Sequence, residues 1–218
     1  MSKIFGRFAA LREVTAAFQP GRVYAIFGDN GAGKSTLLRV ICGLASATAG
    51  KVMIFGSRER SVFTSRLGYM GHAPMLYDEM SGIENLRYFA GLYGISDSAR
   101  CEQAIVAVGL DPALTRRVGE YSQGMRQRMS LARAAIHDPE ILLLDEPFSN
   151  LDPGSARAMG QLVAGMRDRG KTILVVTHQA AHLAEIADES LWMSAGRIAA
   201  WERGIAAAER AAASAVVS

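Results

Sequence analysis

The sequence predicts an α/β fold in which a helical segment interrupts a core of strands and helices. Short apolar runs, typical of buried strands, precede residues with helical spacing: 23–27 before 37–41, and 141–144 before 159–166. Between these two units, from about 73 to 138, helical patterns dominate. The chain has 218 residues, of which 50% are hydrophobic, so it can bury a sound core within one domain.

One domain is therefore expected over residues 1–218, with no internal repeat. Its core lobe comprises about 1–71 and 139–203, its helical part about 73–138, and an alanine-rich tail covers 204–218. Helices are expected in the helical part over three segments: 83–93, 99–108 and 123–136. The methionines of the segment 159–166 recur at helical spacing, which indicates core residues rather than cofactor ligands.

A glycine-rich loop follows the first apolar run, at residues 28–36. Its glycines allow positive backbone angles, so successive N–H groups can point at an anion beside the start of the next helix. Lys34 is expected to face solvent without ligand and to reach the β- and γ-phosphates of a nucleoside triphosphate, and Ser35 to ligate Mg²⁺. The strand before the loop and the helix after it argue against a chance match. The expected nucleotide contacts in this loop are Gly28, Asn30, Gly31, Gly33, Lys34, Ser35 and Thr36.

A second motif ends the apolar run 141–144. Asp145 and Glu146 follow at the carboxyl end of the predicted strand, where α/β sheets place their ligands. Asp145 is expected to hold Mg²⁺ through water, and Glu146 to take a proton from an attacking water. Since many loops begin with an acidic residue, this pair is informative mainly because the phosphate loop precedes it.

Residues 121–128 resemble the signature motif of the ATP-binding subunits of ABC transporters, and the resemblance covers essentially the whole chain. The usual form has Gly-Gly-Gln after the serine, whereas Ser122 is followed here by Gln123, Gly124 and Met125. The resemblance implies a P-loop NTPase fold of ABC type, with a mixed β-sheet core lobe and an inserted α-helical subdomain. It also implies that Ser122 and Gly124 bind the γ-phosphate of ATP held by a second subunit.

The same resemblance implies three further site residues. Residues 150–152 look like the D-loop of the family, so Asp152 is expected at the nucleotide. Residues 177–178 look like its H-loop, which makes His178 a candidate catalytic residue. Phe5 stands where the family places the aromatic that stacks on adenine; Phe8 is its competitor, and Phe5 as an ordinary core residue is another reading. Because four residues precede Phe5, either an edge strand is truncated or the start codon lies upstream.

His72 is a departure from the family pattern, which has glutamine in the loop that joins the two subdomains. An imidazole can contact Mg²⁺-bound water but lacks the paired donor and acceptor of an amide. His72 is thus a candidate catalytic residue, with a loop brace as the alternative. The apolar stretch 74–80 borders the groove where family members receive a coupling helix. It is either an exposed docking patch or packing under the helical lobe.

The resemblance also implies partners. The family folds Lys34 and Ser122 onto separated ends of one subunit, so two subunits, expected to form a homodimer, would enclose two ATP molecules. No segment approaches the ~20 apolar residues that span a bilayer. Separate transmembrane subunits are therefore expected, with this chain peripheral on the cytoplasmic face of the inner membrane. A net charge of +3 without a Lys/Arg run argues against nucleic acid as a partner.

The transported substrate is the least specified feature. Residues 72–81 and 84–86 most resemble the haem-exporter ATPases of cytochrome c maturation, which predicts haem export. A drug, lipid or polysaccharide exporter is the main alternative, and a regulatory ATP switch is another. Glu146 and His178 favour turnover over a pure switch. A ribosome-associated ABC protein would normally carry two ATPase units in one chain, and a DNA-repair ABC ATPase would carry a long coiled-coil insertion. The sequence shows neither a second ATPase unit nor a coiled-coil insertion.

Overall fold

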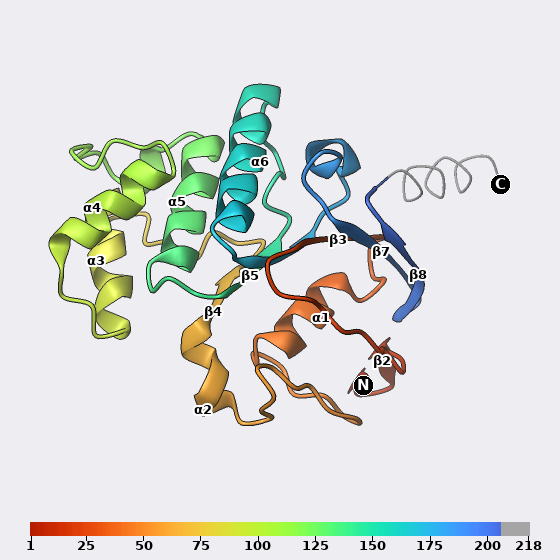
Figure 1. Cartoon of the computed structure of the whole chain (residues 1–218). Coiled ribbons are helices and arrows are strands. Elements are labelled where there is room, and N and C mark those ends of the chain that lie inside the picture. The colour runs from red at the N-terminus through yellow and green to blue at the C-terminus, as the bar shows by residue number, and fades with distance from the viewer. Residues whose placement is uncertain (206–218) are drawn as a thin grey trace.

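The computed structural model describes residues 1–205, so the predicted alanine-rich tail lies outside the described residues except for positions 204 and 205. The described chain forms both strands and α-helices, with three of the α-helices in succession between residues 82 and 135 (Figure 1). The strands are β1 Lys3–Phe5, β2 Phe8–Leu11, β3 Val23–Gly28, β4 Leu67–Met70, β5 Ile141–Asp145, β6 Thr172–Val176, β7 Glu189–Ser194 and β8 Arg197–Arg203. The α-helices are α1 Lys34–Ile41, α2 Arg60–Phe63, α3 Gly82–Leu92, α4 Ser98–Ala107, α5 Gln123–Ala135 and α6 Pro153–Asp168.

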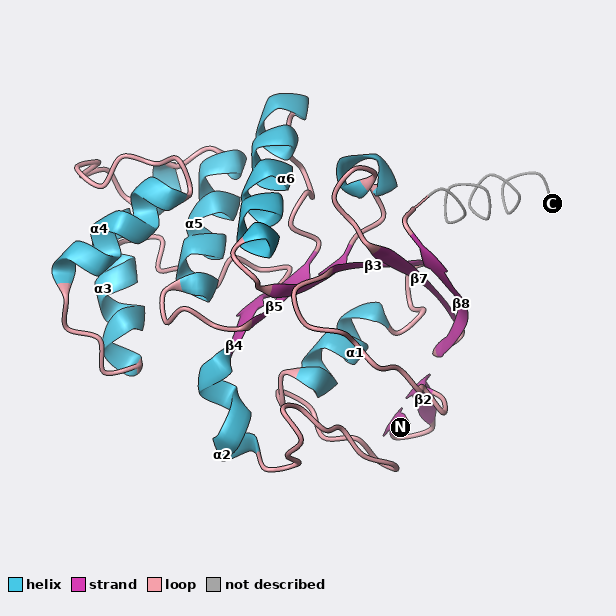
Figure 2. Cartoon of the chain, in the orientation of Figure 1, coloured by secondary structure: helices cyan, strands magenta, loops and turns pink. Residues whose placement is uncertain are grey.

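The centre of the molecule is a sheet with the strand order β4-β5-β6-β3-β7-β8, in which all neighbours are parallel except β7 and β8. Helix α1 lies on one side of this sheet, and α5 and α6 lie on the other (Figure 2). Successive side chains of β3 point to opposite faces, as the period of a strand requires. Val23 and Ala25 join the core under α6, whereas Tyr24 and Ile26 join the core under α1. A sheet buried on both faces explains the continuous apolar runs in the sequence.

Helices α3, α4 and α5 form the helical group and have a core of their own, which includes Leu86, Ile105 and Met129. Helix α5 contributes to two cores at once, because its Leu131 packs with the sheet while its Met129 packs with α3 and α4. The helical group is therefore attached to the sheet through the two faces of α5. The start of α3 is fixed by a capping box between Ser81 and Glu84.

The predicted fold class is confirmed: the sheet is mixed, and helices are inserted between β4 and β5. Each of the three expected helices lies within a residue of its predicted bounds. The methionines of α6, Met159 and Met166, are core residues. Among residues 1–205, no helix combines the length and the apolar character that crossing a bilayer requires.

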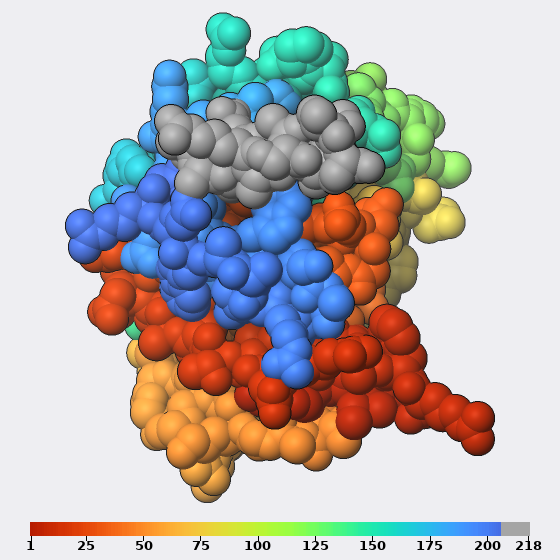
Figure 3. Space-filling model, turned by 90° about the vertical axis from the view of Figure 1, so that its right-hand side faces the viewer, coloured from red at the N-terminus to blue at the C-terminus, as the bar shows by residue number. Residues whose placement is uncertain are grey.

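The start of the chain forms the short antiparallel pair β1–β2, which turns at Gly6. The N–H of Arg12 donates to the carbonyl of Gly196, in the turn between β7 and β8, at 2.8 Å. In Figure 3 this C-terminal hairpin, in blue, lies directly above the N-terminal segment, in red. The N-terminal segment is thereby held near the carboxyl end of β3, where the glycine-rich loop begins.

Candidate active site

Three loops converge at the carboxyl ends of the parallel strands β3, β5 and β6. Val176, the last residue of β6, pairs with Ile26 of β3 on one side and with Asp145 of β5 on the other. The chain continues from these strands into the glycine-rich loop, into Glu146 and into His178. The strand register thus brings residues that lie over a hundred positions apart to one edge of the sheet.

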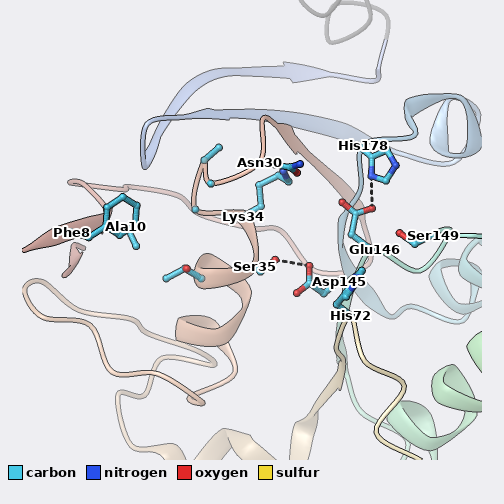
Figure 4. A pocket seen from close by; sticks show the side chains of 14 residues that line it. Phe8, Ala10, Asn30, Lys34, Ser35, His72, Asp145, Glu146, Ser149 and His178 are labelled. Carbon is cyan, nitrogen blue, oxygen red and sulfur yellow. Dashed lines mark hydrogen bonds and ion pairs between the residues drawn. The ribbon is translucent and has the colours of Figure 1, made fainter. Parts of the chain in front are cut away.

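An open cleft with a volume of ≈ 400 Å³ lies at this edge (Figure 4). The residues that line it come from the N-terminal segment, the glycine-rich loop and the three loops after β4, β5 and β6. They are Phe8, Ala10, Asn30, Gly31, Ala32, Gly33, Lys34, Ser35, Thr36, His72, Asp145, Glu146, Ser149 and His178.

The glycine-rich loop wraps around the start of α1. Gly28 and Gly33 have φ angles of 138° and 99°, which side-chain-bearing residues rarely adopt. A Cβ at Gly28 would collide with the carbonyl oxygen of Met193, and one at Gly33 would lie 2.5 Å from the carbonyl oxygen of Ala10. No side chain caps α1. Its first N–H groups therefore provide an anion site at the floor of the cleft.

Lys34 is folded across this loop rather than turned to solvent. Its side-chain Nζ donates to the carbonyl oxygens of Gly28 at 2.6 Å and Asp29 at 3.0 Å, and the residue is 7% exposed. The expectation that Lys34 faces solvent without ligand is wrong. The reason is that the loop turns its own carbonyl groups toward the lysine. The ammonium group is thus held in place at the cleft by the backbone.

Asp145 is buried, and its carboxylate lies next to a hydroxyl of α1. Oγ of Ser35 donates to Oδ1 of Asp145 at 2.8 Å, and Oη of Tyr69 lies 3.5 Å from Oδ2. Burial raises the pKa of Asp145, while the Ser35 hydrogen bond and the nearby Arg39 charge act in the opposite direction. A carboxylate beside a hydroxyl provides the hard oxygen donors that Mg²⁺ prefers, so these two residues fit that cation.

Glu146 and His178 lie next to each other in the cleft, where a dashed line joins them in Figure 4. Nδ1 of His178 lies 3.0 Å from Oε2 of Glu146. This Oε2 is buried and accepts no well-aligned hydrogen bond from residues 1–205. A carboxylate that lines a phosphate-binding cleft and is held by a neighbouring imidazole is suited to orienting a water molecule and accepting its proton.

His72 reaches the cleft from the loop after β4, where Asp145 is also part of the lining. Ser149, which the sequence analysis missed, also lines the cleft. Its N–H donates to the carbonyl of Glu146 at 3.2 Å, so it lies in the turn that follows the acidic pair. The sequence could have indicated Ser149 as a cleft residue, because it lies between Glu146 and the D-loop-like segment 150–152.

The structure brings Phe8, and not Phe5, to the cleft. Phe5 is 51% exposed at the end of β1, with the ammonium group of Lys3 over its ring at 4.6 Å. The chain reverses at Gly6 and pairs Phe5 with Phe8 across the hairpin, and of these two rings it is Phe8 that lines the cleft. The prediction that Phe5 lines the cleft is therefore corrected: Phe8, its competitor, takes that position.

Ser122, Gly124 and Asp152 do not line the cleft but lie close to one another. Ser122 begins α5, and its Oγ accepts from the N–H of Met125 at 3.3 Å. Asp152 begins α6 and accepts from the N–H and the hydroxyl of Ser155, which together lower the pKa of Asp152. A Cβ at Gly124 would lie 2.5 Å from the Ser155 hydroxyl, so the starts of the two helices are in contact.

Comparisons with known proteins agree with this geometry. A protein-family model described as "ABC transporter" matches residues 11–149. The chain is 35% identical over 196 residues to the ABC transporter ATP-binding protein NatA of Bacillus subtilis, covering 87% of this chain and 80% of that protein. It is 36% identical over 194 residues to a fluoroquinolones export ATP-binding protein of Mycobacterium tuberculosis, covering 88% of this chain and 64% of that protein.

A third relative is the bacitracin transport ATP-binding protein BcrA of Bacillus licheniformis, 31% identical over 192 residues, with 86% of this chain and 63% of that protein covered. The chain thus spans less than two thirds of the length of the last two relatives. Among solved structures, a nucleotide-free ATP-binding cassette of an ABC transporter matches with a TM-score of 0.84 and 26% identity, over 97% of this chain and 92% of that one. A dimeric bacterial ABC transporter cassette matches with a TM-score of 0.82 and 25% identity, over 93% and 95%.

Proposed function

The chain belongs to the ABC transporter family, and from this premise we propose that it is the ATP-binding and ATP-hydrolysing subunit of a membrane exporter. The observation that supports this proposal best is the cleft itself. An anion-binding loop, a buried carboxylate–hydroxyl pair and the carboxylate of Glu146 beside His178 meet there. These are the groups that phosphoryl transfer to water requires.

Each group has a distinct role in this proposal. The loop N–H groups and Lys34 bind the phosphates, and Ser35 and Asp145 hold Mg²⁺. Bound Mg²⁺ supplies charge neutralisation at the phosphate oxygens. Glu146 accepts a proton from the attacking water, and His178 orients Glu146 through the 3.0 Å contact. Phe8 stacks on the base, and His72 contacts the water around the metal site.

The separation of Ser122 and Asp152 from the cleft supports a dimer in which each subunit completes the site of the other. The start of α5, with its remaining free N–H groups and Ser122, would then face the γ-phosphate held by the second subunit. The similarity to a dimeric cassette agrees with this arrangement. In the proposed assembly the two chains are identical, and they bind transmembrane subunits from the cytoplasmic face of the membrane.

A drug or a peptide is the substrate class that the relatives favour. The relatives described above are named for fluoroquinolone export and bacitracin transport, and another is a lantibiotic transport ATP-binding protein of Streptococcus pyogenes. None of these is a haem exporter. The predicted haem export therefore lacks support, and the alternative reading as another ABC exporter is the better proposal.

Two measurements test the proposal. Phosphate release from Mg-ATP by the purified chain should be lost in Lys34→Ala, because the loop then lacks its fixed ammonium group. Glu146→Gln should lower turnover about 10²–10⁴-fold, the usual contribution of a general base. Since Glu146→Gln should retain ATP binding, size-exclusion chromatography with Mg-ATP should show a dimer. Undiminished hydrolysis in both variants would refute the assignment of the cleft.

A test of the proposed substrate class requires the transmembrane subunits as well as this chain. With these subunits reconstituted in vesicles, a panel of drugs and cyclic peptides should stimulate ATP hydrolysis, whereas haem should not. If haem alone stimulated ATP hydrolysis, the proposal of a drug or peptide substrate would be wrong and haem export would be supported instead.

A further inference from the structure

Asp78 and Arg126 form an ion pair that joins the loop before α3 to the first turns of α5. Oδ1 of Asp78 lies 2.7 Å from Nη2 of Arg126, and Nη1 of Arg126 donates to the carbonyl of Val118 at 3.1 Å. Arg126 follows Ser122 by four residues, so the two lie on the same face of α5. The N–H of Arg126 donates to the carbonyl of Ser122 at 2.9 Å, in the first turn of the helix.

The loop at residues 77–81, called the Asp78 loop below, is itself fixed by a buried amide. Asn85 is fully buried, and its Nδ2 donates to the carbonyl oxygens of Tyr77 and Ser81, each at 3.0 Å. Its Oδ1 accepts from the N–H of Tyr77 at 2.8 Å. A buried polar group with its bonds satisfied holds its partners in one geometry. The Asp78 loop is therefore a rigid anchor rather than a mobile surface segment.

The residues that lead into Ser122 are fastened to the same loop. The N–H of Val118 donates to the carbonyl of Met80 at 2.8 Å, and the N–H of Gly119 donates to the carbonyl of Asp78 at 3.0 Å. A Cβ at Gly119 would lie 3.1 Å from the carbonyl oxygen of Asp78, so the two segments are closely packed. The backbone bonds fix the approach to Ser122 from one side. The Asp78–Arg126 pair fixes the helix from the other.

We propose that Arg126 is a positioning residue for Ser122 and that Asp78 determines where Arg126 stands. This inference rests on the proposed function, in which Ser122 binds ATP held by a second subunit. Without the ion pair, Arg126 keeps its bond to the carbonyl of Val118 but no longer ties the first turns of α5 to the side chain of Asp78. Ser122 then meets the triphosphate of the partner in a less defined orientation, while the cleft of its own chain is unaltered.

A simpler role for Arg126 would be direct attraction of the triphosphate by its charge. The two roles predict opposite effects of Asp78→Asn. If Arg126 acts only through its charge, removing the neighbouring negative charge strengthens the attraction for ATP, and dimers form at lower ATP concentration. If Arg126 acts by position, the same change weakens dimer formation, because the anchor of its guanidinium group is lost.

The experiment uses the full chain with Glu146→Gln, so that ATP-bound dimers accumulate. The ATP concentration for half-maximal dimer formation is measured by analytical ultracentrifugation in Asp78→Asn, Arg126→Ala and the double variant. Asp78→Asn should raise this concentration roughly three- to tenfold, since one partly exposed ion pair is lost at each of two sites. The double variant should be no worse than Arg126→Ala, because the two residues act through one contact.

Glu79→Gln is the matched control. It removes the same charge one residue away from Asp78, and Glu79 is exposed and forms no ion pair within residues 1–205. It should leave dimer formation unchanged. Binding of a fluorescent ATP analogue to the monomer and the melting temperature should also be unchanged in Asp78→Asn, which separates positioning from a general loss of structure. Asp78→Glu should restore most of the dimer formation.

The outcomes distinguish the inference from the proposed function. If Glu146→Gln alone forms no dimer with Mg-ATP, the two-subunit site fails and the inference fails with it. If this parent forms dimers but Asp78→Asn behaves like Glu79→Gln, the inference is overturned and the two-subunit site stands. Dimers at lower ATP concentration in Asp78→Asn, or additive effects in the double variant, would also overturn it.

Discussion

Nδ1 of His178 lies 3.0 Å from Oε2 of Glu146, although the two residues follow different strands. Glu146 has a φ of 56°, an uncommon and strained conformation for a residue with a side chain. Its N–H is held by the carbonyl of Val176 at 2.8 Å, so the backbone of β6 fixes this conformation. The strained backbone turns the carboxylate toward the cleft, and His178 approaches it from the neighbouring strand end.

Replacing His178 by alanine should affect turnover far more than stability. The side chain of His178 is 61% exposed, and exposed ion pairs contribute little to folding. We expect the melting temperature to change by less than about 2 °C. Turnover should fall about 10²-fold, because the carboxylate of Glu146 loses its orienting contact. Scanning calorimetry and steady-state phosphate release measure the two effects, and a large loss of stability with normal turnover would contradict this role.

Phe8 and Phe5 allow a paired test of the base-stacking position. Phe8→Ala should weaken ATP binding by about 1–3 kcal/mol, the range measured for loss of aromatic stacking on a base. Phe5→Ala removes an equally large exposed ring from the same hairpin, but this ring does not line the cleft. It should leave ATP affinity unchanged. Titration with a fluorescent ATP analogue measures both variants, and equal losses of affinity would indicate that the hairpin as a whole supports the site.

Asp145→Asn should stabilise the nucleotide-free protein while impairing its activity. The pKa of Asp145 is raised in the folded chain, chiefly by burial. Such a carboxyl opposes folding when ionised, and this cost is complete above the raised pKa and vanishes as the pH falls below the ordinary value of 3.8. Asparagine can still accept the Ser35 hydrogen bond without the buried charge.

The melting temperature of Asp145→Asn should therefore exceed that of the parent by roughly 2–4 °C between pH 7 and 8. The difference should shrink as the pH is lowered toward 4. Calorimetry without nucleotide across this pH range checks the sign, and Mg²⁺-dependent hydrolysis should be lost in the same variant. Glu79→Gln, an exposed carboxylate without an ion pair among residues 1–205, serves as the control. A lower melting temperature for Asp145→Asn at pH 8 would mean that the ionised group stabilises the fold.

The sequence predicts the parts of the site that local patterns determine. The apolar runs identify β3 and β5, and the residues that follow each run, Lys34 and Asp145 among them, lie at the same sheet edge because parallel strands align their carboxyl ends. What the sequence does not reveal depends on contacts between distant segments. Phe8 rather than Phe5 lines the cleft, and this depends on how the N-terminal hairpin packs against the turn between β7 and β8. The pairing of Asp78 with Arg126 requires the packing of α3 against α5.

His72 is the residue whose role the family resemblance leaves open, and substitution separates the two readings. It lines the cleft from the loop after β4, next to the buried Asp145. If its imidazole contacts water at the metal site, His72→Gln should retain most of the ATP hydrolysis, because an amide can make the same contact. His72→Ala should lose more activity, since it removes the polar group altogether.

The same order should appear in transport by the complex with its membrane subunits, because the loop that carries His72 connects the cleft to the Asp78 loop. Phosphate release and transport measured in parallel test both expectations. Equal activity and equal transport in the three proteins would mean that His72 braces the loop and takes no part in the chemistry.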